Sequence, residues 1–126
     1  MKDIYSGYGL SQGAVPAVLA ATTTDTGVDL QGFNAALVIV ATGAIAGSGD
    51  FTTKLQESDN NSDFTDVAAG DLLGTFPASL EASSVVKVGY VGNSRYIRTV
   101  TTKNSGTSVA AAIVVVKGHP YDAPVG

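Results

Sequence analysis

The stretch VVKVGYVGNSRYIRTVTTKNSGTSVAAAIVVVK, residues 85–117, decides the fold class of this chain. It holds three runs dominated by apolar and β-branched residues: Val85–Val91, Arg95–Thr102 and Ser108–Lys117. Short clusters of Gly, Asn and Ser separate the runs, and such clusters form tight turns. We therefore predict three consecutive antiparallel strands, and we expect Val114 to lie in the core, so that Val114→Asp abolishes folding.

The first half of the chain predicts further strands. Ala35–Thr42 has a β-branched centre bounded by glycines, which favours a buried strand, and the glycine-rich Gly43–Asp50 is expected to be a loop. Ala14–Thr24 favours an edge strand, because Pro16 lacks the N–H that a central strand donates. A short helix is the alternative for this segment.

A hairpin is expected in the middle of the chain. Phe51–Ser58 alternates apolar and polar residues, Asp59–Ser62 has turn composition, and Asp63–Val67 returns as a short strand. About seven or eight short strands without a helical period predict an all-β fold, either a single-domain antiparallel β-sandwich or a jelly-roll-like barrel. Residues 68–84 are expected to be a long connection with four apolar anchors: Leu72, Leu73, Phe76 and Leu80.

Both ends of the chain differ from this pattern. Residues 1–13 are rich in Gly, Ser and Tyr without periodicity, and residues 119–126 contain two prolines. We therefore expect an N-terminal arm over residues 1–13, the β-sandwich domain over residues 14–118 and a C-terminal tail over residues 119–126. Tyrosines on such arms are candidate anchors on a neighbouring protein: Tyr5, Tyr8 and Tyr121.

Composition narrows the classes of function. Of the 126 residues only 14% are charged, against about 25% in a typical soluble domain, so small neutral polar groups cover the surface and cost little to desolvate at a protein contact. The net charge is −4 and the seven Lys and Arg are scattered, which argues against direct nucleic-acid binding. There is no Cys for a disulfide or metal site. Neither a secretion signal nor a span of about 20 apolar residues is recognisable, so we expect synthesis in the cytoplasm and no membrane contact.

Residues that could carry chemistry do not form a catalytic motif. The one histidine, His119, has no nucleophile or carboxylate near it in sequence, and is expected to be a solvated tail residue. Ser84 and Lys87 have the spacing of a serine–lysine motif, but a strand turns residues three apart to opposite faces. We therefore expect no enzymatic activity and no cofactor.

The acidic hairpin is a candidate metal site. Asp59, Asn61 and Asp63 match the first half of a calcium-binding loop, but the glycine and the final glutamate that this loop requires are missing. A polar hairpin turn is therefore expected, and a weak site that adds Asp50 or Asp66 is the remaining alternative. Carboxylates of the same hairpin lack the apolar pocket that a glycosidase needs: Glu57, Asp63 and Asp66.

A short basic segment contains an aromatic residue between two arginines, as in some RNA-binding sheets. Arg95 and Arg98 are three apart and point to opposite faces of a strand, so we expect them to pair with acidic residues of neighbouring strands or subunits. Tyr96 is expected to lie partly in the core.

Four segments of the chain carry a resemblance to a known family: Val28–Phe33, Lys54–Val67, Val86–Arg98 and Gly106–Gly118. In this order they resemble small virion structural proteins encoded in the head gene cluster of tailed bacteriophages. The resemblance implies a capsid decoration, or cement, protein or a minor capsid protein. Its partners would be the major capsid protein and further copies of itself, as a dimer or trimer, on the capsid surface of the virion.

Two other functions compete with this interpretation. One is another part of the virion, such as a head fibre base, a tail tube subunit or a connector subunit. The other is a carbohydrate-binding module for host recognition, although such modules usually present exposed Trp and this chain has none.

Overall fold

The computed structural model describes residues 9–120 and is built of strands, with one turn of 3₁₀ helix, η2 (Ala69–Asp71). The long strands are the ones that the alternating and β-branched runs predict. The strands are β1 (Gly9–Leu19), β2 (Thr23–Thr24), β3 (Val28–Asp29), β4 (Phe33–Ala46), β5 (Asp50–Ser58), β6 (Thr65–Asp66), β7 (Leu72–Leu73), β8 (Val85–Tyr90), β9 (Tyr96–Ser105) and β10 (Ser108–Pro120).

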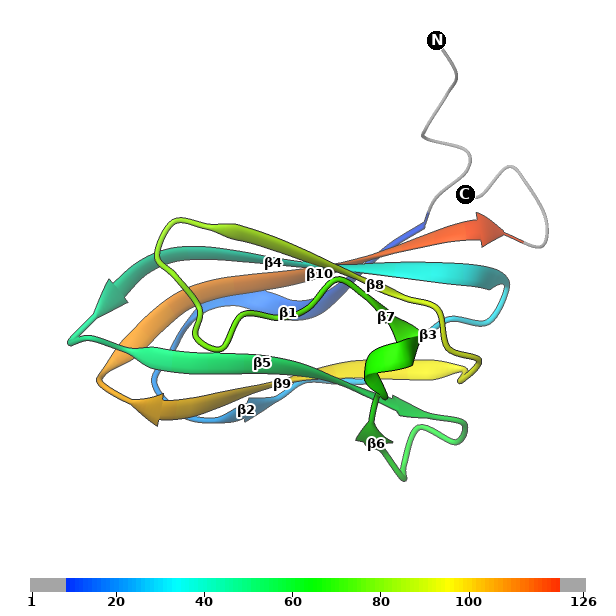
Figure 1. The fold of residues 1–126 in the computed structure, drawn as a ribbon, viewed down its shortest axis with the longest axis horizontal. Coiled ribbons are helices and arrows are strands. Elements are labelled where there is room, and N and C mark those ends of the chain that lie inside the picture. Colours follow the sequence, from blue (N-terminus) through cyan, green and yellow to red (C-terminus); the bar gives the residue numbers. More distant parts are fainter. Residues whose placement is uncertain (1–8, 121–126) are drawn as a thin grey trace, which may run out of the picture.

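The strands form two antiparallel sheets packed face to face (Figure 1). The first sheet has the order β1-β10-β4-β8-β7, and the second has the order β2-β9-β5-β6, with β3 also paired to β9. In Figure 1 the first sheet is the upper layer and the second sheet is the lower layer. This arrangement confirms the prediction of an all-β antiparallel sandwich.

Alternate residues of the long strands build the core between the sheets. Phe51 and Ile97 of the second sheet are completely buried, as are Val38 and Val40 of the first. On β10 the buried apolar side chains are the odd-numbered ones, Val109, Ala111, Ile113 and Val115. The expectation that Val114 lies in the core is therefore wrong, because Val114 points away from the second sheet and is only half-buried.

Hydrogen bonds satisfy the polar side chains of the core. Thr53 and Thr101 lie opposite each other on β5 and β9, and their Oγ1 atoms are 3.1 Å apart. The Thr99 hydroxyl donates to the Asp25 carboxylate at 2.6 Å, while burial raises the pKa of Asp25 above its ordinary value. These bonds offset the cost of removing the hydroxyls from water.

The ends of the sandwich domain differ from the predicted boundaries. Strand β1 begins at Gly9, which pairs with Lys117, so residues 9–13 belong to the sheet and not to an arm. Likewise β10 continues through His119 to Pro120, so the backbone of His119 is not part of a tail. Pairing with β10 explains the first extension, and pairing of Gly118 and Pro120 with β4 explains the second.

The edge strand predicted over Ala14–Thr24 is divided between the sheets: β1 ends at Leu19 and forms the edge of the first sheet, whereas Thr23 and Thr24 form β2 in the second. The register of β1 against β10 shifts between Ala14 and Ala17, so the segment containing Pro16 bulges out of the ladder. A bulge is where an edge strand accommodates a residue without an N–H. Strand β1 therefore pairs with β10 on both sides of the bulge and forms one edge of the sheet.

The loop predicted over Gly43–Asp50 is shorter than expected. Strand β4 runs to Ala46, which still pairs with Ser108, and β5 already begins at Asp50. The reversal is made at Gly47 and Ser48, whose φ angles are +58° and +56°. The hairpin of β5 and β6 is confirmed, and in the connection that follows Leu80 is buried whereas Leu73 is 63% exposed.

Candidate interaction surfaces

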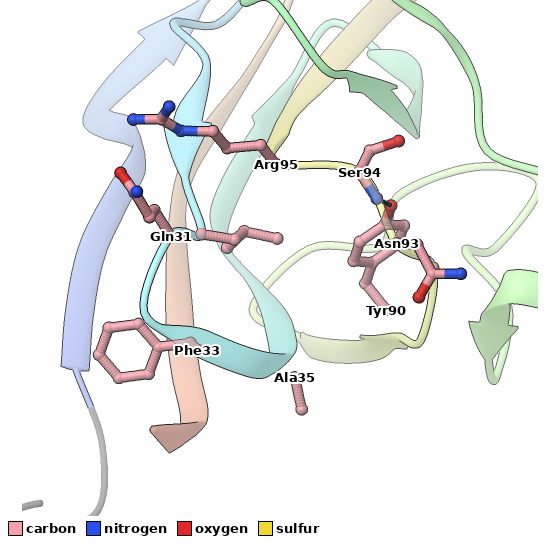
Figure 2. A pocket seen from close by; sticks show the side chains of 9 residues that line it. Gln31, Phe33, Ala35, Tyr90, Asn93, Ser94 and Arg95 are labelled. Carbon is pink, nitrogen blue, oxygen red and sulfur yellow. Dashed lines mark hydrogen bonds between the residues drawn. The ribbon is translucent and has the colours of Figure 1, made fainter. Parts of the chain in front are cut away.

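A cleft of about 360 Å³ opens at one end of the sandwich, where the two sheets separate (Figure 2). Figure 2 shows Gln31, Phe33 and Arg95 on one side of it and Tyr90, Asn93 and Ser94 on the other. The loop after β8 supplies Asn93 and Ser94, and the turn before β4 supplies Gln31.

A hydrogen-bond network closes the inner wall of this cleft. The Tyr90 hydroxyl donates to Oε1 of Glu57 at 2.7 Å and accepts the backbone N–H of Ser94 at 3.1 Å. The Ser94 hydroxyl donates to the same Glu57 oxygen at 3.1 Å. Burial, together with the bond to Glu57, raises the pKa of Tyr90 to about 12. Because Tyr90 is on β8 and Glu57 on β5, the network joins the two sheets.

The arginine of the cleft is held by an acidic residue outside it. Arg95 donates from Nε and Nη2 to the two carboxylate oxygens of Asp29, both at 3.0 Å. These bonds lower the pKa of Asp29 and raise that of Arg95. This is the pairing with an acidic residue that we expected for Arg95.

Three polar side chains of the cleft already have partners, since Tyr90 and Ser94 contact Glu57 and Arg95 contacts Asp29. Tyr90 is 2% exposed, so its ring does not offer a stacking surface to a sugar. Arg95 donates two hydrogen bonds to the Asp29 carboxylate, and its guanidinium lies 5.0 Å from the centre of the Tyr96 ring. The cleft is better described as a structural joint between the sheets than as a ligand site.

The acidic hairpin is organised by amide and hydroxyl groups. Oδ1 of Asn60 accepts the backbone N–H groups of Ser62 and Asp63, both at 2.9 Å, and the Ser58 hydroxyl accepts those of Asn60 and Asn61. Such bonds are typical of a polar turn. Within residues 9–120 no cluster of three or more acidic or histidine side chains is suited to a metal ion.

The carboxylates weighed as a glycosidase pair serve separate contacts. Glu57 faces Tyr90, whereas Asp66 accepts from Nε2 of Gln56 at 2.9 Å and from Nζ of Lys54. Arg98 donates to Gln56 and lies over the ring of Phe64, 4.0 Å from its centre. The expected pairing with an acidic residue is therefore wrong for Arg98, which contacts an amide and an aromatic ring instead.

The three tyrosines predicted as anchors, Tyr5, Tyr8 and Tyr121, lie outside the residues that the structure describes. The strands that lead to them, β1 and β10, end beside each other, because Gly9 pairs with Lys117. Over residues 9–120 no helix is long and apolar enough to cross a membrane.

The outer face of the first sheet is apolar, a feature that the sequence analysis missed. On β10 and β4 the residues next to the buried ones point outward and pair in rows, Val116 with Leu37, Val114 with Ile39, and Ala112 with Ala41. At the flanks Leu10, Val18, Val85 and Leu73 are 63–74% exposed. We call this surface the apolar face.

Polar groups on the apolar face lie near its edges. Gln12 of β1 is in the row of Val114, and Lys87 of β8 is in the row of Ile39. In contrast, the outer face of the second sheet carries Lys54, Gln56 and Arg98 in its middle, joined by side-chain hydrogen bonds to one another or to β6. Polar side chains thus lie in the middle of one outer face of the sandwich and near the edges of the other.

Comparison with known proteins identifies similar structures but no similar sequences. No known protein family matches the chain, and no curated protein is similar to it. The crystal structure of the SPBc2 prophage-derived protein YomS is similar over 94% of this chain and 100% of that chain, with a TM-score of 0.52 and 11% sequence identity. This chain therefore shares the two-sheet fold of YomS.

Two viral structures match more distantly. The infectious bursal disease virus Gx strain structure has a TM-score of 0.47 and 12% identity, over 93% of this chain and 33% of that chain. The VP2 subviral particle of the same virus has a TM-score of 0.45 and 11% identity, over 89% and 32%.

Proposed function

We propose that this chain is a non-enzymatic structural subunit of a bacteriophage virion. More specifically, it is a capsid decoration protein that binds the major capsid protein and stabilises the head. The observation that carries the structural-subunit role is the apolar face, because a domain rarely leaves a sheet surface without charge on its central strands unless protein, either another copy or a different chain, covers it. The fold shared with a prophage-derived protein and the resemblance to phage head proteins supply the context.

The proposed attachment to the capsid uses the two ends of the chain. Strands β1 and β10 end side by side, so residues 1–8 and 121–126 start from one end of the body. Their tyrosines, Tyr5, Tyr8 and Tyr121, combine a large apolar ring with a polar hydroxyl, which suits a protein contact. Many copies, each with a modest interface, would together stabilise a shell.

Capsids that lack this protein provide the test. Purified protein is added to them, and bound copies per capsid and the capsid melting temperature are measured. We expect saturable binding and a higher melting temperature. Full-length protein that neither binds nor raises the melting temperature would contradict the decoration role, and a virion reconstruction that locates the chain in the tail would favour a tube or connector subunit.

A truncated variant separates the anchor from the body. Removal of residues 1–8 leaves every strand pair of β1 intact, whereas removal of residues 1–13 also takes away the pairing of Gly9–Gln12 with β10. We expect the shorter truncation to melt like the full chain and to occupy fewer capsid sites. Equal occupancy would show that residues 1–8 are not the anchor, without affecting the decoration role.

A further inference from the structure

Along β10 and β4 the apolar face has a bulky end and a hollow end, and Val18 of β1 and Val85 of β8 flank the hollow end. At one end Val116 and Leu37 form a row with Leu10, and Leu73 lies over the surface of Gly89. At the other end a shallow groove of about 450 Å³ runs between β1 and β4 over small residues, among them Ala110, Ala112 and Ala41. Gly43 contributes to this groove, because a Cβ there would lie only 3.3 Å from that of Ala110.

This gradient makes the face complementary to itself. A two-fold axis in the plane between two such faces, running across the strands, places the bulky end of each copy over the hollow end of the other. Val114 then faces the partner copy's row of Ala112, and the row of Ile39 faces that of Ala41. An interface in which the same patch serves both subunits is the normal arrangement of a symmetric dimer.

The charges on the face fit the same arrangement. Two like faces repel each other when they carry like charges in their centre, and here the central strands β10 and β4 present only apolar side chains between Ala110 and Val116. Lys87 lies on β8. Because β7 pairs only with Tyr90 and Gly89, no strand lies beside Lys87 on that side, and its ammonium can extend to water at the rim of the face. An apolar centre with a polar rim is typical of protein interfaces.

The size of the face also suits a dimer. Four long strands spaced by about 4.8 Å and seven residues of about 3.3 Å give a projected area on the order of 450 Å², to which the two residues of β7 add. Accessible area exceeds projected area because it follows the relief of the side chains, so the two faces together approach about 1,200 Å², the lower end of stable interfaces.

We propose that two copies of this chain pack their apolar faces together as a symmetric dimer, so that the sheets β1-β10-β4-β8-β7 form the two middle layers of a four-layer assembly. The proposal explains why β10 is apolar on both faces, a pattern usual for strands that are covered on both sides. The inference rests on the proposed function, since the dimer would be the unit that decorates the capsid. Dimer formation itself can be measured on the free protein.

Sedimentation velocity of the purified full chain, without capsids, tests the dimer. We expect twice the 12.7 kDa mass of one chain. Val85→Asp places a carboxylate on the face at a side chain that is 74% exposed, so it leaves folding intact and should yield monomers. Val114→Asp should do the same in the middle of the face. The matched control is Thr102→Asp, a β-branched position of β9 on the outer face of the second sheet, which should remain dimeric.

Each other outcome contradicts the proposal. A wild-type monomer at every concentration up to about 100 μM, or a trimer, would overturn the two-fold packing. A Val85→Asp protein with native circular dichroism that stays dimeric would show that another surface joins the copies. Because no capsid is present, any of these results leaves the decoration role to its own experiment.

Discussion

Replacing Tyr90 with Phe removes the hydroxyl that joins the two sheets at the cleft. The side chain is 2% exposed, and its ring remains in place in the variant, so the change isolates the polar contacts. Two hydrogen bonds are lost: the one donated to Glu57 at 2.7 Å and the one accepted from the Ser94 N–H at 3.1 Å. Glu57 keeps the hydroxyl of Ser94 as a donor.

The expected cost follows from the charge on Glu57. A hydrogen bond to a charged group contributes about 1.5–3 kcal/mol. In the variant Glu57 keeps only the Ser94 hydroxyl as a donor, and the Ser94 N–H loses its acceptor. We therefore expect Tyr90→Phe to lower the free energy of unfolding by about 2 kcal/mol at pH 7. Urea denaturation at fixed protein concentration, followed by circular dichroism, measures this difference.

The pH dependence has a defined sign. In the unfolded chain a tyrosine ionises near its ordinary pKa of about 10, whereas Tyr90 in the folded protein has a pKa of about 12. The folded state therefore favours the protonated hydroxyl, and this contribution is fully present below pH 10 and is lost as the pH rises to about 12. The stability difference between wild type and Tyr90→Phe should shrink over that interval.

Tyr96→Phe is the control, because it removes a half-buried tyrosine hydroxyl from the neighbouring sheet and should change stability by less than about 0.5 kcal/mol. Equal stability of Tyr90→Phe and wild type at pH 7, or a difference that grows between pH 10 and pH 12, would refute the role given to the network.

Two further substitutions test the strand register and a turn. Ile113→Asp puts a charge where the side chain is 1% exposed, so no cooperative thermal transition should remain; a native-like melt would mean that β10 has the opposite register. Gly106→Ala adds a Cβ at a φ of +81°, against the carbonyl oxygen of Ser48, and should cost more than about 1 kcal/mol. An unchanged denaturation midpoint for that variant would contradict the turn geometry.

The strands could be predicted because alternation and turn residues are local signals. The same signals failed on β10, where the run from Val109 to Val116 is apolar at every position and period two cannot tell which side faces the core. Val114 was therefore assigned to the wrong face. A run without alternation is itself typical of strands that are covered on both faces.

The sheet ends and the cleft depended on partners distant in sequence. Nothing local distinguishes residues 9–13 from an arm, and they become a strand because Lys117 and its neighbours pair with them. Glu57, Tyr90 and Ser94 meet only when the two sheets pack. Pairing of Arg95 with an acid was predictable in kind, but the choice of Asp29 depended on β3 lying beside β9.

The position of β10 has a consequence for how the chain folds. It is the last strand in the sequence, yet it lies between β1 and β4, the first strand and a central one. The second sheet can pair β5 with β6 and β9 early, but β1 has no partner until the C-terminal segment is available. We therefore expect folding on the ribosome to stop at a partly formed sandwich. The final step is then the insertion of β10 between β1 and β4.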